Sequence, residues 1–239
     1  MKLDLLAIAA HPDDAELTCG GTLIKMAQMG YKTGVLDLTR GEMGTRGMPE
    51  TRLREAARAA RIMGLRMRAN LGLPDARLEI SEKYKLAVAA KIREWQPRTV
   101  ILPYWEGRHP DHYTASLLSY EGCFLAGLKQ LPVAGEAFRP FKILYSTAYD
   151  ESVRPSFAVD ITEQFEQRRR AILAYESQFR PKKRSKKSWV HLPLDTLEER
   201  MNLTSRYYGR MIGVRYAEPF LVREVMRIDD VIAMPVRSV

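Results

Sequence analysis

The sequence predicts a single α/β domain with a Rossmann-like, doubly wound, mostly parallel sheet and helices on both faces. Short apolar runs of strand length alternate with longer segments of helical periodicity, as in successive βαβ units. Glycine or proline follows most of the helical segments, as expected at helix ends. The 239 residues fit one such domain, and no linker interrupts the first 150.

The first half of the chain contains the alternation in its clearest form. Strands are expected at 3–10, 33–39, 68–73 and 98–104. Helices are expected at 16–29, ended by Gly30; at 49–63, ended by Gly64; at 81–95, ended before Pro97; and at 113–128. We expect residues 1 to about 130 to form the Rossmann-like core that contains the functional site.

The second half continues the pattern less regularly. Strands are expected at 142–147 and 156–162, and helices at 163–178 and 194–211, the last stopping at Gly213 before "EPFLVREV". We expect residues from about 140 to 239 to complete the fold and the substrate side of the site.

Composition excludes several classes of protein. The 46% hydrophobic and 28% charged residues are typical of a soluble globular protein, and no apolar run approaches the roughly 20 residues that span a bilayer. The first ten residues lack the cleavage site of a signal peptide. Cys19 and Cys123 are too few for a disulfide framework, so we expect free thiols in a cytoplasmic protein without membrane contact.

The net charge of +9 lies mostly in the C-terminal third, much of it in "RPKKRSKK" at 180–187. Such a run could bind nucleic acid or an acidic ligand. No aromatic residues are interleaved with it to stack on bases, and no nucleic-acid-binding motif accompanies it. We therefore expect a solvated loop, with no nucleic-acid partner. His191, in the same segment, is interpreted as a surface residue rather than a metal ligand.

Three of the four histidines fall in two nearly identical motifs, "HPDD" at 11–14 and "HPDH" at 109–112. A lone His-Pro-Asp commonly forms a turn or caps a helix. Here each copy follows an expected strand, and open parallel sheets place their ligand sites outside the carboxyl ends of the strands. If the two strands are parallel neighbours, imidazoles and carboxylates converge in one cleft, which predicts a zinc site.

The spacing of these residues also suggests their roles. A catalytic zinc takes three protein ligands and leaves one position open, which His11, Asp14 and His112 satisfy. Asp13 is next to a ligand without needing to be one, so its carboxylate could accept a proton from the attacking water. His109 faces the same pocket and could donate a proton or stabilise an oxyanion.

These motifs resemble a known family. "AHPDDAELTCGGTL", "TRGEMGTRG", "ETRLREAARAARIMG" and "RHPDH" are similar to the LmbE-like, or PIG-L, zinc N-deacetylases, which remove acetyl groups from N-acetylglucosamine conjugates. "AYESQF" and "YYGRMIGVRYAEPF" resemble the bacillithiol-biosynthesis branch, which deacetylates N-acetylglucosaminyl-L-malate. The resemblance implies zinc ligation by His11, Asp14 and His112, with Asp13 as general base and His109 as acid or oxyanion partner.

The resemblance also implies that Arg52 of "ETRLREA" reaches the substrate. A guanidinium suits the carboxylates of a malate aglycone. The alternative interpretation is that Arg52 is simply an exposed arginine on the surface of its helix. Arg46, in a glycine-rich loop that could equally be a surface turn, and Arg108 are lesser candidates for substrate contact.

Several alternatives remain open from the sequence. Two histidines and a carboxylate also describe an iron(II) oxygenase, and Fe²⁺ or Co²⁺ could occupy the zinc ligands. The basic run leaves a nucleic-acid-binding protein as a non-enzymatic alternative. The small-molecule amino-sugar substrate could carry inositol, a chitooligosaccharide or an antibiotic sugar instead of malate. Relatives of this kind are often hexamers, so the resemblance implies a homo-oligomer.

Overall fold

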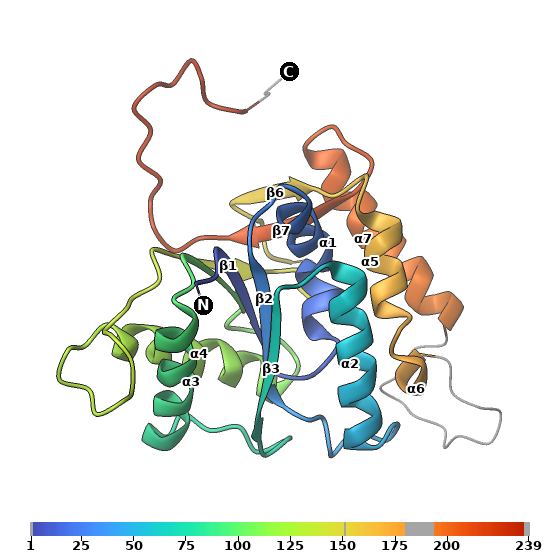
Figure 1. The fold of residues 1–239 in the computed structure, drawn as a ribbon. Coiled ribbons are helices and arrows are strands. Elements are labelled where there is room, and N and C mark those ends of the chain that lie inside the picture. Colours follow the sequence, from blue (N-terminus) through green and yellow to red (C-terminus); the bar gives the residue numbers. More distant parts are fainter. Residues whose placement is uncertain (1, 151, 180–193, 237–239) are drawn as a thin grey trace.

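A seven-stranded sheet forms the centre of the computed structural model, which describes residues 2–150, 152–179 and 194–236 (Figure 1). Its order is β3-β2-β1-β4-β5-β7-β6. The strands are β1 (Leu5–Ala9), β2 (Thr33–Thr39), β3 (Met67–Leu73), β4 (Thr99–Pro103), β5 (Lys142–Ser146), β6 (Phe157–Asp160) and β7 (Ala217–Leu221). Strand β7 pairs antiparallel with both of its neighbours, and the other pairings are parallel. The predicted fold class is confirmed.

Helices cover both faces of the sheet. They are α1 (Asp14–Gln28), α2 (Pro49–Met63), α3 (Glu82–Trp95), α4 (Pro110–Ala126), α5 (Phe165–Ile172), α6 (Glu176–Phe179) and α7 (Leu194–Met211). Helices α3 and α4 lie on one face, and α1, α2, α5 and α7 on the other (Figure 1). Side chains of β1 alternate between two buried clusters: Leu5 and Ala7 join the α1 side, and Leu6 and Ile8 the α3 side. Burial on both faces explains why this strand is apolar throughout.

One expected helix is wrong. The segment 163–178 does not form a single helix, because α5 ends at Ile172 and the short α6 begins only at Glu176. The intervening turn buries Tyr175, whose hydroxyl donates a hydrogen bond to Glu16 Oε1 at 3.1 Å. Continuing the helix would carry this side chain away from its partner, so a contact with a distant residue overrides the local periodicity.

The structure tests only part of what the composition predicts. Cys19 and Cys123 are free and buried, and burial raises the pKa of both thiols. Within the described ranges, no helix is both long and apolar enough to cross a membrane. The basic run at 180–187 and His191 lie outside the described residues.

Helix α1 is interrupted at Cys19, whose φ of −147° is not helical. In a continuous helix, the carbonyls of Leu17 and Thr18 would accept from the amides of Gly21 and Thr22. Instead, Gly21 N and Thr22 N donate to the carboxylate of Glu218 on β7, at 2.8 and 2.7 Å. The interruption therefore leaves amides whose partner comes from nearly 200 residues away in the chain.

The freed carbonyls are also bonded. Arg168 of α5 donates to the carbonyls of Glu16 and Leu17, and Ser146 Oγ donates to that of Thr18 at 2.9 Å. Arg168 and Glu218 are themselves paired, with Nε and Oε1 separated by 3.1 Å and both side chains almost fully buried. This pair joins the C-terminal elements to the helix whose first turn carries Asp14.

We predict that Glu218→Gln destabilises the protein. The amide removes the negative charge beside the buried Arg168 guanidinium, and loss of one partner of a buried pair typically costs about 3 kcal/mol. Urea denaturation measures the change in free energy of unfolding. Glu166→Gln is the matched control, because Glu166 is exposed and pairs with Arg169 only at 3.7 Å. A loss no larger than that of the control would show that the pair does not stabilise the break in α1.

Candidate active site

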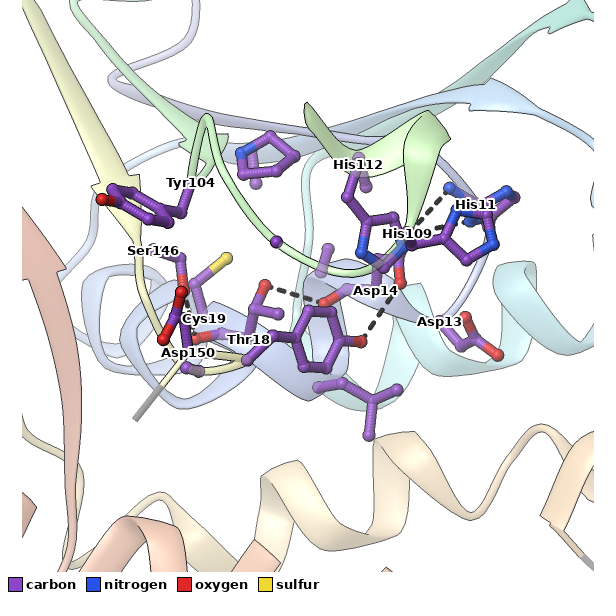
Figure 2. A pocket seen from close by; sticks show the side chains of 18 of the residues that line it. His11, Asp13, Asp14, Thr18, Cys19, Tyr104, His109, His112, Ser146 and Asp150 are labelled. Atoms are coloured by element: carbon purple, nitrogen blue, oxygen red, sulfur yellow. Dashed lines mark hydrogen bonds and ion pairs between the residues drawn. The ribbon is translucent and has the colours of Figure 1, made fainter. Parts of the chain in front are cut away.

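The two histidine motifs meet at the centre of the sheet. Strand β1 pairs with β4 in parallel, with Leu5 opposite Thr99 and Ala7 opposite Ile101. The 11–14 motif follows β1 and the 109–112 motif follows β4, so both lie at the carboxyl edge where the strand order reverses. Both line a cavity of about 740 Å³. In Figure 2, His11, His109 and His112 gather at one end of this cavity beside Asp14.

Three side chains form a compact group of metal-ligand atoms. Asp14 Oδ2 lies 3.2 Å from His11 Nδ1 and 3.2 Å from His112 Nε2. Ligand atoms of these three residues all lie within 4.8 Å of one another. Helix α4 begins at Pro110 rather than near Tyr113, so His112 lies in its first turn. The structure thus brings together the three residues expected to bind zinc.

This donor set fits a divalent cation. Tetrahedral ligands at about 2.1 Å from zinc are separated by about 3.4 Å, close to the spacing of Asp14 from each imidazole. A second group, His11 with His109 and Asp111, also satisfies the spacing for a metal. In that group, however, His109 Nδ1 already accepts the amide hydrogen of Asp111 at 3.2 Å. His109 Nδ1 is therefore not free to bind a metal in that group, and the group with Asp14 and His112 is the one that the sequence predicts.

The surroundings of this group of metal-ligand atoms favour a positive charge. Burial lowers the pKa of His11, but hydrogen bonds with Asp111, Asp14 and Asp75 outweigh it and raise the pKa well above its usual value. Burial raises the pKa of Asp14, but His112 and His11 hold it well below its usual range. The same field that favours an imidazolium here would favour a bound cation.

Asp13 has a different environment from its neighbour. It precedes α1 with a φ of 107°, a conformation uncommon for a residue other than glycine. Burial raises the pKa of its carboxyl to about 7, although the charge of Arg52 opposes the shift. Figure 2 shows its carboxylate set apart from Asp14. The two adjacent aspartates therefore belong to different parts of the site.

His109 lies against both histidines expected to bind metal. Its ring stacks on His112 at 4.7 Å between centroids and contacts His11 edge-on at 4.9 Å. Because Nδ1 accepts the amide hydrogen of Asp111, a neutral ring carries its proton on Nε2. Burial and the neighbouring His112 and His11 lower its pKa, which favours this neutral form.

The three candidate arginines occupy different places. Arg52 is buried, so it is not an exposed helix arginine, and its guanidinium contacts Pro12 O, Gly41 O and Asp13. Arg46 donates to Gln178 O at 3.0 Å. Arg108 is exposed on the cavity wall. Arg52 and Arg108 line the cavity, and Arg46 lies on the glycine-rich loop beside it. The contact of these arginines with substrate stays a prediction.

Two residues of the site are not among those predicted from the sequence. Tyr149, just after β5, donates its hydroxyl to Asp14 Oδ1 at 3.1 Å and stacks on His112 at 5.3 Å. Asp75, just after β3, contacts His11 Nε2 through Oδ1 at 2.9 Å and accepts from Met43 N. Both follow strands at the carboxyl edge of the sheet, which is the signal that could have found them.

Comparison with known proteins identifies the family. A family model described as PIG-L, GlcNAc-PI de-N-acetylase, matches residues 6–121. Diacetylchitobiose deacetylase of Thermococcus kodakarensis is 31% identical over 229 residues, which cover 90% of this chain and 80% of that protein. The chain belongs to the PIG-L, or LmbE-like, family of deacetylases. The family assignment made from the motifs is therefore confirmed.

Solved structures agree with the family and the fold. The conserved protein TT1542 from Thermus thermophilus is 42% identical with a TM-score of 0.84, over 95% of this chain and 98% of that one. N,N'-diacetylchitobiose deacetylase from Pyrococcus horikoshii, in complex with its inhibitor MPG, is 26% identical with a TM-score of 0.78, over 91% and 82%. The fold shared with these two structures thus extends through nearly the whole chain.

We predict that Tyr149→Phe weakens metal binding. The variant keeps the ring on His112 but loses the hydroxyl that orients Asp14, and such supporting hydrogen bonds typically change metal affinity about tenfold or more. Competition with a chromogenic zinc chelator measures the affinity. Tyr31→Phe, at an exposed tyrosine outside the cavity lining, is the control. Equal affinity in Tyr149→Phe and the unaltered protein would contradict the orienting role.

Proposed function

We propose that this PIG-L protein is a metal-dependent hydrolase that removes the N-acetyl group from an N-acetylglucosamine conjugate. The supporting observation is the arrangement of His11, Asp14 and His112 as a metal-ligand group, with Asp13 and His109 in the same cavity. Zinc is the proposed metal, with Fe²⁺ or Co²⁺ as alternatives for the same ligands. Family membership favours this hydrolysis over the oxygenase alternative.

The reaction adds water to the acetamide carbonyl and breaks the C–N bond, which releases acetate and the free amine. A divalent cation held by His11, Asp14 and His112 would supply Lewis acidity, polarising the carbonyl and lowering the pKa of the attacking water. Asp13 accepts the proton that this water loses. Burial raises its pKa to about 7, so the carboxylate is a strong enough base to accept this proton and can then pass it to the nitrogen of the leaving amine.

The proposed role of His109 is at the carbonyl oxygen of the acetamide. Its neutral ring directs Nε2–H away from Asp111, which makes that proton available to the carbonyl oxygen as negative charge develops. The lowered pKa of His109 suits a neutral hydrogen-bond donor more than a permanently charged acid. We therefore favour oxyanion stabilisation over proton donation for this residue.

N-acetylglucosaminyl-L-malate is the proposed substrate, as in bacillithiol biosynthesis. Arg108 is exposed on the cavity wall and is the proposed partner of a malate carboxylate, with Arg46 on the neighbouring loop as a second candidate. Diacetylchitobiose is the alternative, because a diacetylchitobiose deacetylase is 31% identical over nine-tenths of this chain. The two candidates share the acetamido sugar and differ in charge.

We predict that Asp13→Asn removes most turnover while leaving the metal site intact. An amide cannot accept the proton from water, and a general base typically contributes about 10²- to 10⁴-fold to the rate. The expected outcome is a kcat lower by about that factor with unchanged zinc content, measured by amine release and by elemental analysis. Asp4→Asn, at an exposed hydrogen bond distant from the cavity, is the control. Near-normal turnover in Asp13→Asn would refute its role as the base.

A substrate series tests the proposed function. Amine release is measured on N-acetylglucosaminyl-malate, N-acetylglucosaminyl-inositol, diacetylchitobiose and N-acetylglucosamine, with zinc-loaded and chelated protein. We expect the highest kcat/KM on the malate conjugate and loss of activity on chelation. Preference for a neutral conjugate would keep the deacetylase and discard malate. No metal-dependent release from any of them would overturn the proposed function.

A further inference from the structure

The segment 105–108, between β4 and α4, carries Arg108 on the cavity wall with little support from its backbone. Its residues make no hydrogen bond with any part of the chain that the structure describes. Gly107 has a φ of +142°, and a Cβ built on it would meet no atom within 4 Å. Only the ends are held: the amide of Tyr104 donates to β5 at 3.2 Å, and His109 begins α4. The segment therefore depends on side-chain packing for its position.

Trp105 provides this packing. Its neighbours Tyr104, Glu106 and Arg108 line the cavity, but Trp105 does not, and it packs instead against the buried cluster on the α3 and α4 side of the sheet. Its ring meets that of Tyr145 edge-on, with 4.7 Å between centroids, and lies 4.6 Å from the ring of Tyr104. Trp105 is thus the side chain by which the segment is attached to the fold.

Arg223, two residues after the end of β7, lies over the same ring. Its Cζ is 4.3 Å from the centroid of Trp105 and 4.9 Å from those of Tyr120 and Tyr145. A guanidinium over an aromatic face is attracted by the quadrupole of the ring. The guanidinium makes no hydrogen bond or ion pair with the described residues, so the three rings are its partners. A residue near the C-terminus thus contacts the segment that leads to the second histidine motif.

His109, which follows the segment, has anchors of its own. Its Nδ1 accepts the amide hydrogen of Asp111 at 3.2 Å, and its ring stacks on His112 at 4.7 Å between centroids. Arg108 makes no hydrogen bond or ion pair with the described residues. Loosening the segment 105–108 would therefore displace Arg108 and leave His109 in place.

We propose that Arg223 is a positioning residue for substrate specificity, which holds Trp105 and so keeps Arg108 where it can pair with a carboxylate of the aglycone. The inference rests on the proposed function, in which Arg108 contacts malate. It gives the chain that follows β7 a part in substrate binding, although this chain does not line the cavity.

Kinetics on a charged and a neutral substrate test this role. The apparent affinity falls with the fraction of molecules whose Arg108 is in place, and an exposed cation–π contact changes such a fraction by up to about fivefold. Arg223→Met should therefore raise KM for N-acetylglucosaminyl-malate about threefold to fivefold. Its kcat on both substrates, and KM for neutral diacetylchitobiose, should stay unchanged.

The control is Arg227→Met, at an exposed arginine of the same C-terminal segment that pairs with Asp229 at 2.9 Å. It should change neither constant on either substrate. An unchanged KM for the malate conjugate in Arg223→Met would overturn the proposal. Equal rises in KM on both substrates would also overturn it, because they would show a general effect on the cavity.

A double-mutant cycle connects the effect to Arg108. Arg108→Met should raise KM for the malate conjugate at least as much as Arg223→Met does. In the Arg108→Met background, Arg223→Met should have no further effect, because the side chain that it positions is absent. Factors that multiply in the double variant would show that Arg223 does not act through Arg108. An unchanged KM in Arg108→Met would remove both the malate contact and this inference.

Arg223→Lys separates the contribution of the cation from that of chain packing. A lysine ammonium is still attracted by the face of Trp105, but it lacks the planar guanidinium that stacks on the ring. We expect KM for the malate conjugate to lie between those of Arg223→Met and the unaltered enzyme. A value as high as that of Arg223→Met would contradict support by a cation over the ring.

Fluorine NMR of protein labelled with 5-fluorotryptophan gives a readout without activity. The chain has three tryptophans, and loss of one resonance in Trp105→Phe assigns that residue. We expect Arg223→Met to shift the Trp105 resonance and to leave that of the buried Trp95 unmoved. An unmoved Trp105 resonance would overturn the proposal. If the unaltered protein deacetylates none of the conjugates, the proposed function fails, and this resonance still decides whether Arg223 holds Trp105.

Discussion

The parallel pairing of β1 with β4 is the constraint on which the site depends. Neither histidine motif contains a complete set of metal ligands, and the 11–14 and 109–112 segments are nearly a hundred residues apart in the chain. Pairing in register puts the ends of the two strands side by side, so that His112 Nε2 comes within 3.2 Å of Asp14. The remaining elements act on this arrangement: α1 begins at one motif, α4 begins at the other, and the break in α1 fixes where its first turn lies.

Two adjacent carboxylates can serve different purposes only if their environments differ. Asp14 opens helix α1 and faces His11 and His112, which hold its pKa far below that of a free carboxyl. The positive φ of Asp13 turns its side chain toward Arg52, where burial raises its pKa to about 7. One carboxylate therefore stays charged and suits a cation, while the other can exchange a proton near neutral pH. Backbone strain at a single residue produces this separation.

Local signals and sheet topology explain what the sequence could predict. Strand length, helix stops and the strand-end rule were enough to place His11, Asp14 and His112 in one group, with Asp13 and His109 beside them. The missed features depend on single residues paired over long distances. Tyr149 and Asp75 stand alone after β5 and β3 without a motif, and the break in α1 depends on Arg168 and Glu218. The failed helix at 163–178 has the same cause, a tyrosine bonded to a buried glutamate.

The motif that resembles the malate branch forms several hydrogen bonds within the fold. In "AYESQF", Tyr175 donates to Glu16, Ser177 Oγ donates to Glu55 Oε2 at 2.7 Å, and Gln178 Nε2 donates to the carbonyl of Arg46 at 2.7 Å. These bonds join α6 and the turn before it to α1, α2 and the glycine-rich loop beside the cavity. A chain needs them to hold that loop whatever its aglycone, so the motif is stronger evidence for the shape of the cavity wall than for malate. Discrimination between a charged and a neutral aglycone has to come from cations that remain accessible, and Arg108 on the cavity wall is one of these.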